Sequence, residues 1–200
     1  MTAKFVVFEG PDASGKTTQA KRVAARRGAL FTREPGGTPI GEQIRAVLLN
    51  TDHHEMHART EALLYAAQRA QNVAEMIVPA LEAGRDVVSD RFVASSIAYQ
   101  GVGRGLGIPA VAALSEFATG GVVPDLVVLL EVPAEVTEER LAGSLDRLEQ
   151  VGLGLQRDVL AAYHELAQAD AERWVLVDGV GSPDEVAKRL DVVLAERLGW

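Results

Sequence analysis

Eight residues near the N-terminus combine glycines, a lysine and a hydroxyl group at a spacing that suits phosphate. Residues 10–17 satisfy the pattern G-x-x-x-x-G-K-[ST] in full, after an apolar run and before a helical pattern. In such a loop backbone N–H groups converge on phosphate oxygens, Lys16 can reach the β and γ phosphates, and Thr17 offers a hydroxyl to Mg²⁺. We therefore predict an ATP site formed by Gly10, Pro11, Asp12, Ala13, Ser14, Gly15, Lys16 and Thr17.

A GTP-dependent switch protein could carry the same loop. Guanine recognition in such proteins uses an Asn-Lys-x-Asp segment. The lysines of this chain are Lys4, Lys16, Lys21 and Lys188, and none of them follows an asparagine. The sequence thus favours an ATP-dependent phosphotransferase over a GTP switch.

Length and composition narrow the class of protein further. With 200 residues, 48% of them hydrophobic and 24% charged, the chain is predicted to form a single domain over residues 1–200. A net charge of −8 argues against a nucleic-acid partner, whose binding surface is normally basic. The longest apolar runs have only the length of a strand, and the N-terminus lacks a signal-peptide pattern, so we expect a cytoplasmic protein without a membrane partner. The absence of cysteine excludes disulfides and thiolate catalysis.

Apolar runs of strand length alternate with segments of helical spacing along the whole chain. The predicted strands are residues 5–8, 29–32, 87–89, 126–130 and 174–177, and the predicted helices are residues 16–27, 40–49, 60–83, 109–118, 133–142, 155–169 and 183–198. This alternation predicts an α/β fold with a five-stranded parallel sheet sandwiched by helices, and with ligands at the carboxyl ends of the strands. The glycine-rich stretch 143–154 indicates a mobile lid at about residues 140–157.

Four segments resemble the thymidylate kinase family of P-loop nucleoside monophosphate kinases. They are residues 8–10 with the phosphate loop, residues 32–38 with Arg45, residues 64–69, and residues 90–101. Their order and spacing match the family over the whole chain, and Pro124-Asp125 and Asp146-Arg147 extend the match. The resemblance implies a short helical lid, a homodimer, and direct in-line transfer of the γ-phosphoryl group of ATP to dTMP, with Mg²⁺, in dTTP biosynthesis.

The same resemblance implies roles for individual residues. Asp12 would hold the 3′-hydroxyl of the acceptor, Tyr65 would stack on thymine, and Arg69, one helical turn later, would bond a base carbonyl. Asp90 would orient the acceptor phosphate through Arg91 or a water molecule bound to Mg²⁺, so Thr17 and Asp90 form the expected metal site. The arginines around the acceptor would be Arg33, Arg45, Arg69 and Arg91, and the further polar contacts would come from Ser95, Ser96, Tyr99 and Gln100. Ser95 and Ser96 remain equal candidates for the base contact.

The catalytic arginine beyond Arg91 is expected in the lid. Relatives that carry an arginine inside the phosphate loop have it where Ala13 stands, so this chain resembles the group that supplies it from the lid. Arg147, within Asp-Arg, is the first candidate, Arg140 is the second, and Arg157 lies nearby. The expected catalytic residues are therefore Lys16, Asp90, Arg91, Arg147 and Arg140.

Two alternatives to this function stay open: another nucleotide or nucleoside kinase of the same architecture, and a non-catalytic nucleotide-binding module. A cluster of histidines, His53, His54 and His57 around Glu55, also resembles a metal site. It lacks the H-E-x-x-H order, and we expect an exposed loop between two helices there.

Overall fold

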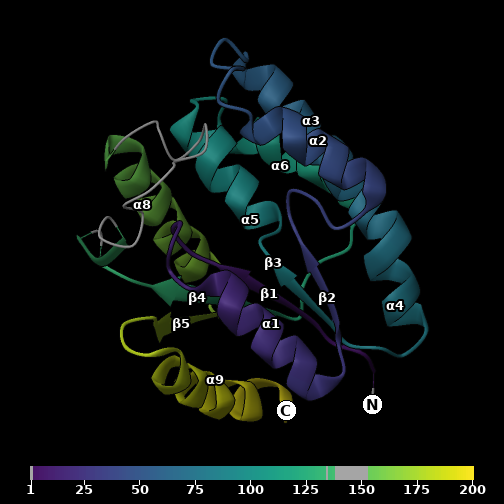
Figure 1. Cartoon of the computed structure of the whole chain (residues 1–200), viewed down its shortest axis with the longest axis vertical. Coiled ribbons are helices and arrows are strands. Elements are labelled where there is room, and N and C mark those ends of the chain that lie inside the picture. The colour runs from purple at the N-terminus through teal and green to yellow at the C-terminus, as the bar shows by residue number, and fades with distance from the viewer. Residues whose placement is uncertain (1, 134, 138–152) are drawn as a thin grey trace.

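Five parallel strands form one sheet at the centre of the molecule (Figure 1). The structure is a computed structural model and describes residues 2–133, 135–137 and 153–200. The strands are β1 (Phe5–Glu9), β2 (Leu30–Arg33), β3 (Val87–Asp90), β4 (Leu126–Glu131) and β5 (Trp174–Asp178). Their order is β2-β3-β1-β4-β5 and every neighbouring pair is parallel, so the carboxyl ends of all five strands meet at one edge.

Helices cover both faces of this sheet. They are α1 (Lys16–Arg27), α2 (Pro39–Leu49), α3 (Ala58–Asn72), η1 (Val73–Ile77), α4 (Val78–Glu82), α5 (Val93–Ser96), η2 (Ile97–Gly103), α6 (Ile108–Thr119), α8 (Leu153–Ala169) and α9 (Pro183–Leu198). Helices α1 and α9 pack on one face, while η1, α5, η2 and α8 supply the core of the other (Figure 1). No described helix is long and apolar enough to cross a membrane.

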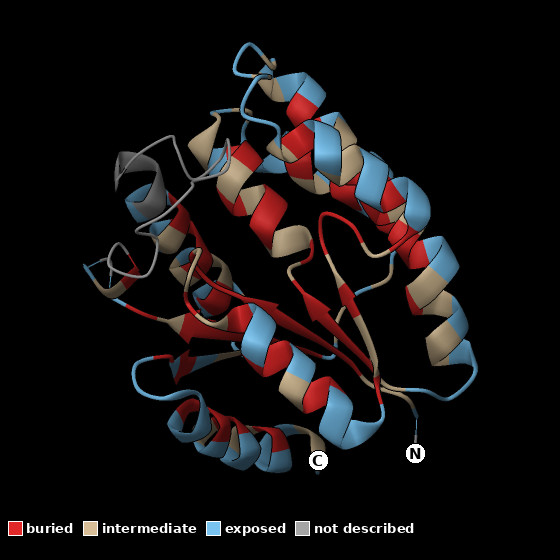
Figure 2. Cartoon of the chain, in the orientation of Figure 1, coloured by how far each residue is buried: buried red, intermediate tan, exposed pale blue. Residues whose placement is uncertain are grey.

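The alternation of side chains along the strands explains why both faces are covered. Phe5 and Val7 belong to the core cluster beneath α8, whereas Val6 and Phe8 belong to the cluster beneath α1 and α9. Successive strand residues point to opposite faces, so a strand that is apolar at every position needs a helical layer on each side. Figure 2 shows the resulting pattern, with buried strands between helices whose outer faces are exposed.

The predicted fold class is confirmed, with two differences in the helices. The expected helix 60–83 is divided into α3, the π-helical segment η1 and α4. Pro79 lies at the start of α4, where its ring removes an N–H donor and crowds the preceding turn, and a widened π-helical turn accommodates it. The segment from Val93 to Gly103 is helical although its small residues and glycines gave no helical pattern. Most of the helix expected at 133–142 lies outside the described residues.

Candidate active site

The phosphate loop joins the end of β1 to the start of α1. Gly10 has a φ of +142°, and a Cβ atom there would lie 2.6 Å from the carbonyl oxygen of Leu130. Gly15 has a φ of +93° and caps the N-terminus of α1. Both positions therefore require glycine, which explains why the sequence spaces its glycines in this way. The loop brings its N–H groups to the positive end of the helix dipole, where an anion is stabilised.

Lys16 is the buried cation of this loop. Its Nζ atom donates to the carbonyl oxygen of Pro11 at 2.7 Å and lies 3.9 Å from a carboxylate oxygen of Asp12. Burial, followed by the nearby charge of Arg91, lowers the pKa of Lys16 to about 8. Lys16 therefore begins to lose its charge only slightly above neutral pH. A bound phosphate would raise its pKa again and keep it charged.

Thr17 and Asp90 meet where β3 ends beside the phosphate loop. The hydroxyl of Thr17 donates a hydrogen bond to Oδ2 of Asp90. The other carboxylate oxygen of Asp90, Oδ1, is buried and has no hydrogen-bond partner among the described residues. A hydroxyl and an unsatisfied carboxylate oxygen are ligands of the type that Mg²⁺ prefers.

Arg91 connects the phosphate loop to the opposite side of the site. Its Nη2 atom donates to Asp12, and its Nη1 atom donates to the hydroxyl groups of Ser95 at 3.0 Å and Tyr163 at 3.2 Å. Burial opposes the charge of Asp12, but Arg91 and Lys16 outweigh burial and lower the pKa of Asp12 to about 2. Burial also opposes the charge of Arg91, and Asp12 reverses this effect and raises its pKa. The pair is thus fully ionised at neutral pH.

A buried carboxylate, Glu9, holds the segment that carries Arg91. It accepts hydrogen bonds from the backbone N–H groups of Phe92 at 3.0 Å and Ser95 at 3.2 Å, and from the hydroxyl groups of Ser95 at 2.6 Å and Tyr163 at 3.0 Å. Burial raises the pKa of Glu9. The sequence indicated no role for Glu9, although it lies in the matching segment 8–10, and none for Tyr163, because a contact between residues 154 positions apart gives no local motif.

A cavity of about 390 Å³ opens at this edge of the sheet. It is lined by Asp12, Ala13, Gly15, Lys16, Thr17, Thr18, Arg33, Glu34, Pro35, Arg45, Leu49, Tyr65, Asp90, Arg91, Ser95, Tyr99 and Gln100. The cavity therefore brings the phosphate-loop lysine together with most of the residues expected around an acceptor nucleotide. Ser96 and Arg69 do not line it.

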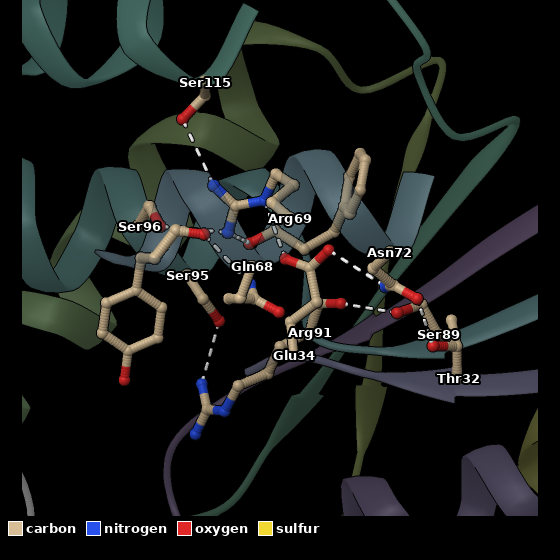
Figure 3. Close-up of polar contacts among 12 residues, drawn as sticks. Thr32, Glu34, Gln68, Arg69, Asn72, Ser89, Arg91, Ser95, Ser96 and Ser115 are labelled. Carbon is tan, nitrogen blue, oxygen red and sulfur yellow. Dashed lines mark hydrogen bonds and ion pairs between the residues drawn. The ribbon is translucent and has the colours of Figure 1, made fainter. Parts of the chain in front are cut away.

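Arg69 is buried in a network of polar contacts beside residues that line this cavity (Figure 3). Its Nε atom donates to Glu34 at 2.7 Å, and its Nη2 atom donates to the hydroxyl of Ser96 at 3.0 Å and to the carbonyl oxygen of Phe92 at 3.0 Å. The side chain is 1% exposed. Ser96 thus faces Arg69, whereas Ser95 faces the cavity and Arg91. The expected contact between Arg69 and a base carbonyl stays a prediction.

Four further residues that were predicted to contact the acceptor have defined positions in the structure. Arg33 forms an exposed ion pair with Glu42 at 3.0 Å, and Arg45 donates to the carbonyl oxygen of Pro35 at 2.8 Å. Tyr99 donates from its hydroxyl to Asp12 at 2.9 Å. Tyr65, 8% exposed, contributes part of the cavity wall from α3. These side chains come from four separate elements, β2, α2, α3 and η2.

Polar residues of α3 hold the loop after β2 in place, and the sequence analysis had not assigned them. Gln68 accepts a hydrogen bond from the backbone N–H of Gly36 at 3.0 Å. Asn72 donates to Glu34 at 3.2 Å and accepts from Thr32 at 2.7 Å. Gln68 and Asn72 are four positions apart on one helix face, a polar pattern in a buried helix that could have identified them.

The remaining candidates contribute no described contact to the site. Arg140 and Arg147 lie outside the described residues, and Arg157 is exposed on α8. Between α2 and α3, His57 accepts from the backbone N–H of Arg59 at 3.2 Å. In the described part of the chain, no three histidine or acidic side chains gather as metal ligands.

A parallel sheet with a phosphate loop after its first strand, and a polar cavity at the same edge, defines a P-loop nucleotide-binding protein. Residues 8–190 match the family model described as thymidylate kinase. The chain is 45% identical over 206 residues to the thymidylate kinase of Latilactobacillus sakei subsp. sakei, which covers 98% of this chain and 96% of the relative. It is 46% identical over 200 residues to that of Thermomicrobium roseum, covering 96% and 94%. The chain belongs to the thymidylate kinase family.

The buried ion pair between Arg69 and Glu34 generates a prediction about stability. Arg69→Met should lower the free energy of unfolding by about 3 to 5 kcal/mol, because it leaves a buried carboxylate without its partner. Arg22→Met is the matched control, since the Arg22–Asp184 pair is exposed to water and should contribute far less to the free energy of unfolding. Urea unfolding measures the free energy of unfolding of both variants. Equal losses would contradict the claim that the pair between Arg69 and Glu34 is a buried ion pair.

The lowered pKa of Lys16 generates a second prediction. In the nucleotide-free protein Lys16 loses its proton as the pH rises through about 8. The affinity for ATP should therefore fall between pH 7.5 and pH 9.5, by up to about tenfold per pH unit above the pKa. Lys16→Arg, whose charge does not titrate in this range, should show a much flatter dependence. Calorimetric titration at each pH is the measurement, and an affinity of the unmodified protein that does not change would refute the prediction.

Proposed function

We propose that the protein is a thymidylate kinase that transfers the γ-phosphoryl group of ATP to dTMP and releases dTDP and ADP. One observation carries the proposal: Lys16 and Asp12 of the phosphate loop line the same cavity as Tyr65 and Gln100. Donor phosphates on the loop and an acceptor nucleotide in the cavity would thus meet at the residues that neutralise their charge. Catalysis of this kind depends on positioning and electrostatic stabilisation.

A second cavity supports the assignment of the donor side. It has a volume of about 320 Å³ and lies beside the phosphate loop. Its lining combines Ser14, Gly15, Thr18 and Gln19 with Gly179 and Gly181 from the β5–α9 connection and with Pro183 and Val186 from α9. The nucleoside of ATP would occupy this cavity while its phosphates follow the loop toward Lys16.

The transfer itself would depend on three residues of the chain. Lys16 would bind the β and γ phosphates, Arg91 would bind the acceptor phosphate, and Asp90 would orient the reacting groups. The Thr17 hydroxyl and the unsatisfied Asp90 oxygen fit a Mg²⁺ ion. Bound there, Mg²⁺ would supply positive charge that offsets the charge of the phosphate oxygens.

The acceptor nucleotide would be held by the other side chains of the larger cavity. Tyr65 would stack on the base, and Asp12 would accept a hydrogen bond from the 3′-hydroxyl. The proposed contacts to the phosphate and the base come from Arg33, Arg45, Arg69, Ser95, Ser96, Tyr99 and Gln100. The cavity lining supports Ser95 over Ser96 as a direct contact, with Ser96 acting through Arg69.

Residues outside the described part of the chain complete the proposal. Residues 1–200 would form one domain whose lid at about 140–157 supplies Arg147, with Arg140 as the alternative catalytic arginine. The family resemblance supports a homodimer, and we further propose that the enzyme is cytoplasmic.

The test is a panel of acceptors, dTMP, dUMP, dCMP, AMP and GMP, with ATP as the donor and ADP release as the readout. We expect dTMP to give the highest kcat/KM. Lys16→Ala should lower turnover by orders of magnitude with an unchanged circular dichroism spectrum, because it removes the charge that neutralises the transferred group. A preference for AMP or GMP would indicate a different nucleotide kinase, and no acceptor-dependent ADP release would indicate a non-catalytic binding module.

A further inference from the structure

The side-chain amide of Gln100 forms part of the acceptor cavity and is oriented from behind by a charged residue. We propose that Glu61 is a positioning residue that turns the carbonyl oxygen of Gln100 toward the bound base. The oxygen of Gln100 is then a hydrogen-bond acceptor at the cavity surface. It selects a pyrimidine with a hydrogen on N3 and rejects cytosine. This inference rests on the proposed function and assigns its base specificity to a residue that does not touch the base.

The contact between the two side chains is short and shielded from water. Glu61 lies in the first turn of α3 and is 0% exposed, and Gln100 lies in η2 and is 1% exposed. Nε2 of Gln100 donates to Oε1 of Glu61 at 2.9 Å. Tyr65 follows Glu61 by one helical turn on the same face of α3, and Tyr65 and Gln100 both line the cavity. The oriented amide therefore faces the space in which Tyr65 would stack on a base.

The chemistry of the carboxylate determines which end of the amide can face it. An ionised carboxylate only accepts hydrogen bonds, whereas an amide has a donor end and an acceptor end. If Gln100 presented its oxygen to Glu61, two acceptors would meet in a buried place at a large cost in free energy. The nitrogen of Gln100 must therefore face Glu61, and the oxygen is the end left for the cavity.

Arg104 forms an ion pair with the carboxylate of Glu61 and fixes its plane. Its Nη2 atom donates to Oε2 of Glu61 at 2.9 Å, and its Nε atom donates to Oε1 at 3.3 Å. A two-point contact of this kind is strong and directional. Arg104 follows η2 directly, so the same segment that carries Gln100 also carries the cation that fixes its partner.

The consequence for the substrate follows from the hydrogen-bonding edge of each base. Thymine and uracil carry a hydrogen on N3, which can donate to the oxygen of Gln100. Cytosine has an unprotonated N3, so a second acceptor would face the oxygen, and a buried unpaired polar contact is costly. The 5-methyl group is not involved, so this device separates dCMP from dTMP and dUMP but does not separate dTMP from dUMP.

Glu61→Gln tests the proposal because Arg104 remains in place. In Glu61→Gln only one of the two side-chain end atoms accepts hydrogen bonds, so Nη2 of Arg104 and Nε2 of Gln100 compete for it. The orientation of Gln100 is then no longer fixed, and its nitrogen can turn toward the cavity. The ratio of kcat/KM for dTMP to that for dCMP should fall by about 10- to 100-fold. The ratio for dTMP to dUMP should change by less than about twofold. Glu82→Gln is the control, since it makes the same chemical change at an exposed residue at the end of α4 and should leave both ratios unchanged.

An equal loss of kcat/KM for all three acceptors, with an unchanged dTMP to dCMP ratio, would show that Glu61 is merely structural and would overturn the proposal. Neutron diffraction from crystals of the unmodified protein gives an independent test should Glu61→Gln not fold. It should find the amide deuterons of Gln100 on the atom that faces Glu61, and the opposite orientation would overturn the proposal. If the unmodified protein phosphorylated no pyrimidine nucleotide, the proposed function would fail, while the orientation of Gln100 would still be decided by the neutron map.

Discussion

The ion pair between Asp12 and Arg91 is the interaction on which the arrangement of the site depends. Asp12 belongs to the phosphate loop and Arg91 follows β3, so the pair joins the donor side to the acceptor side of one cavity. A charge removed from water is costly unless it is compensated, and each partner compensates the other. Lys16 adds a second cation beside Asp12, and the hydroxyl groups of Ser95 and Tyr163 satisfy the other half of the guanidinium.

The same principle recurs around the cavity. Glu34 with Arg69 and Glu61 with Arg104 are further pairs in which a fully buried carboxylate is matched by an arginine from another segment. Each pair orders a different part of the site: Arg69 binds Ser96 and Glu34 of the loop after β2, whereas Glu61 binds Gln100. Such pairs contribute little net stability compared with apolar packing, but removing one partner is costly. Their value here lies in the fixed geometry that they give to the polar groups facing the nucleotides.

The sequence was sufficient for the sheet, because five apolar runs alternating with helices admit few other arrangements. The sequence was also sufficient for the phosphate loop, because Gly10 and Gly15 have positive φ angles that favour glycine. It was insufficient where contacts depend on tertiary structure. Glu9 and Tyr163 meet only because β1 and α8 pack together, and no spacing in the sequence reports that contact. Likewise, helical spacing placed Arg69 beside Tyr65, but only the tertiary structure reveals that Glu34 and Ser96 bind its guanidinium group.

A double-mutant cycle between Asp12 and Arg91 tests most directly the claim that this ion pair unites the two halves of the site. The measurement is kcat/KM for dTMP at saturating ATP in the unmodified protein, Asp12→Asn, Arg91→Met and the double variant. If the two residues act as one unit, the double variant should lose about as much as the more damaging single variant, because the second change removes nothing that the first had left. Losses that add fully in free energy would contradict the account, since they would show that Asp12 and Arg91 act independently.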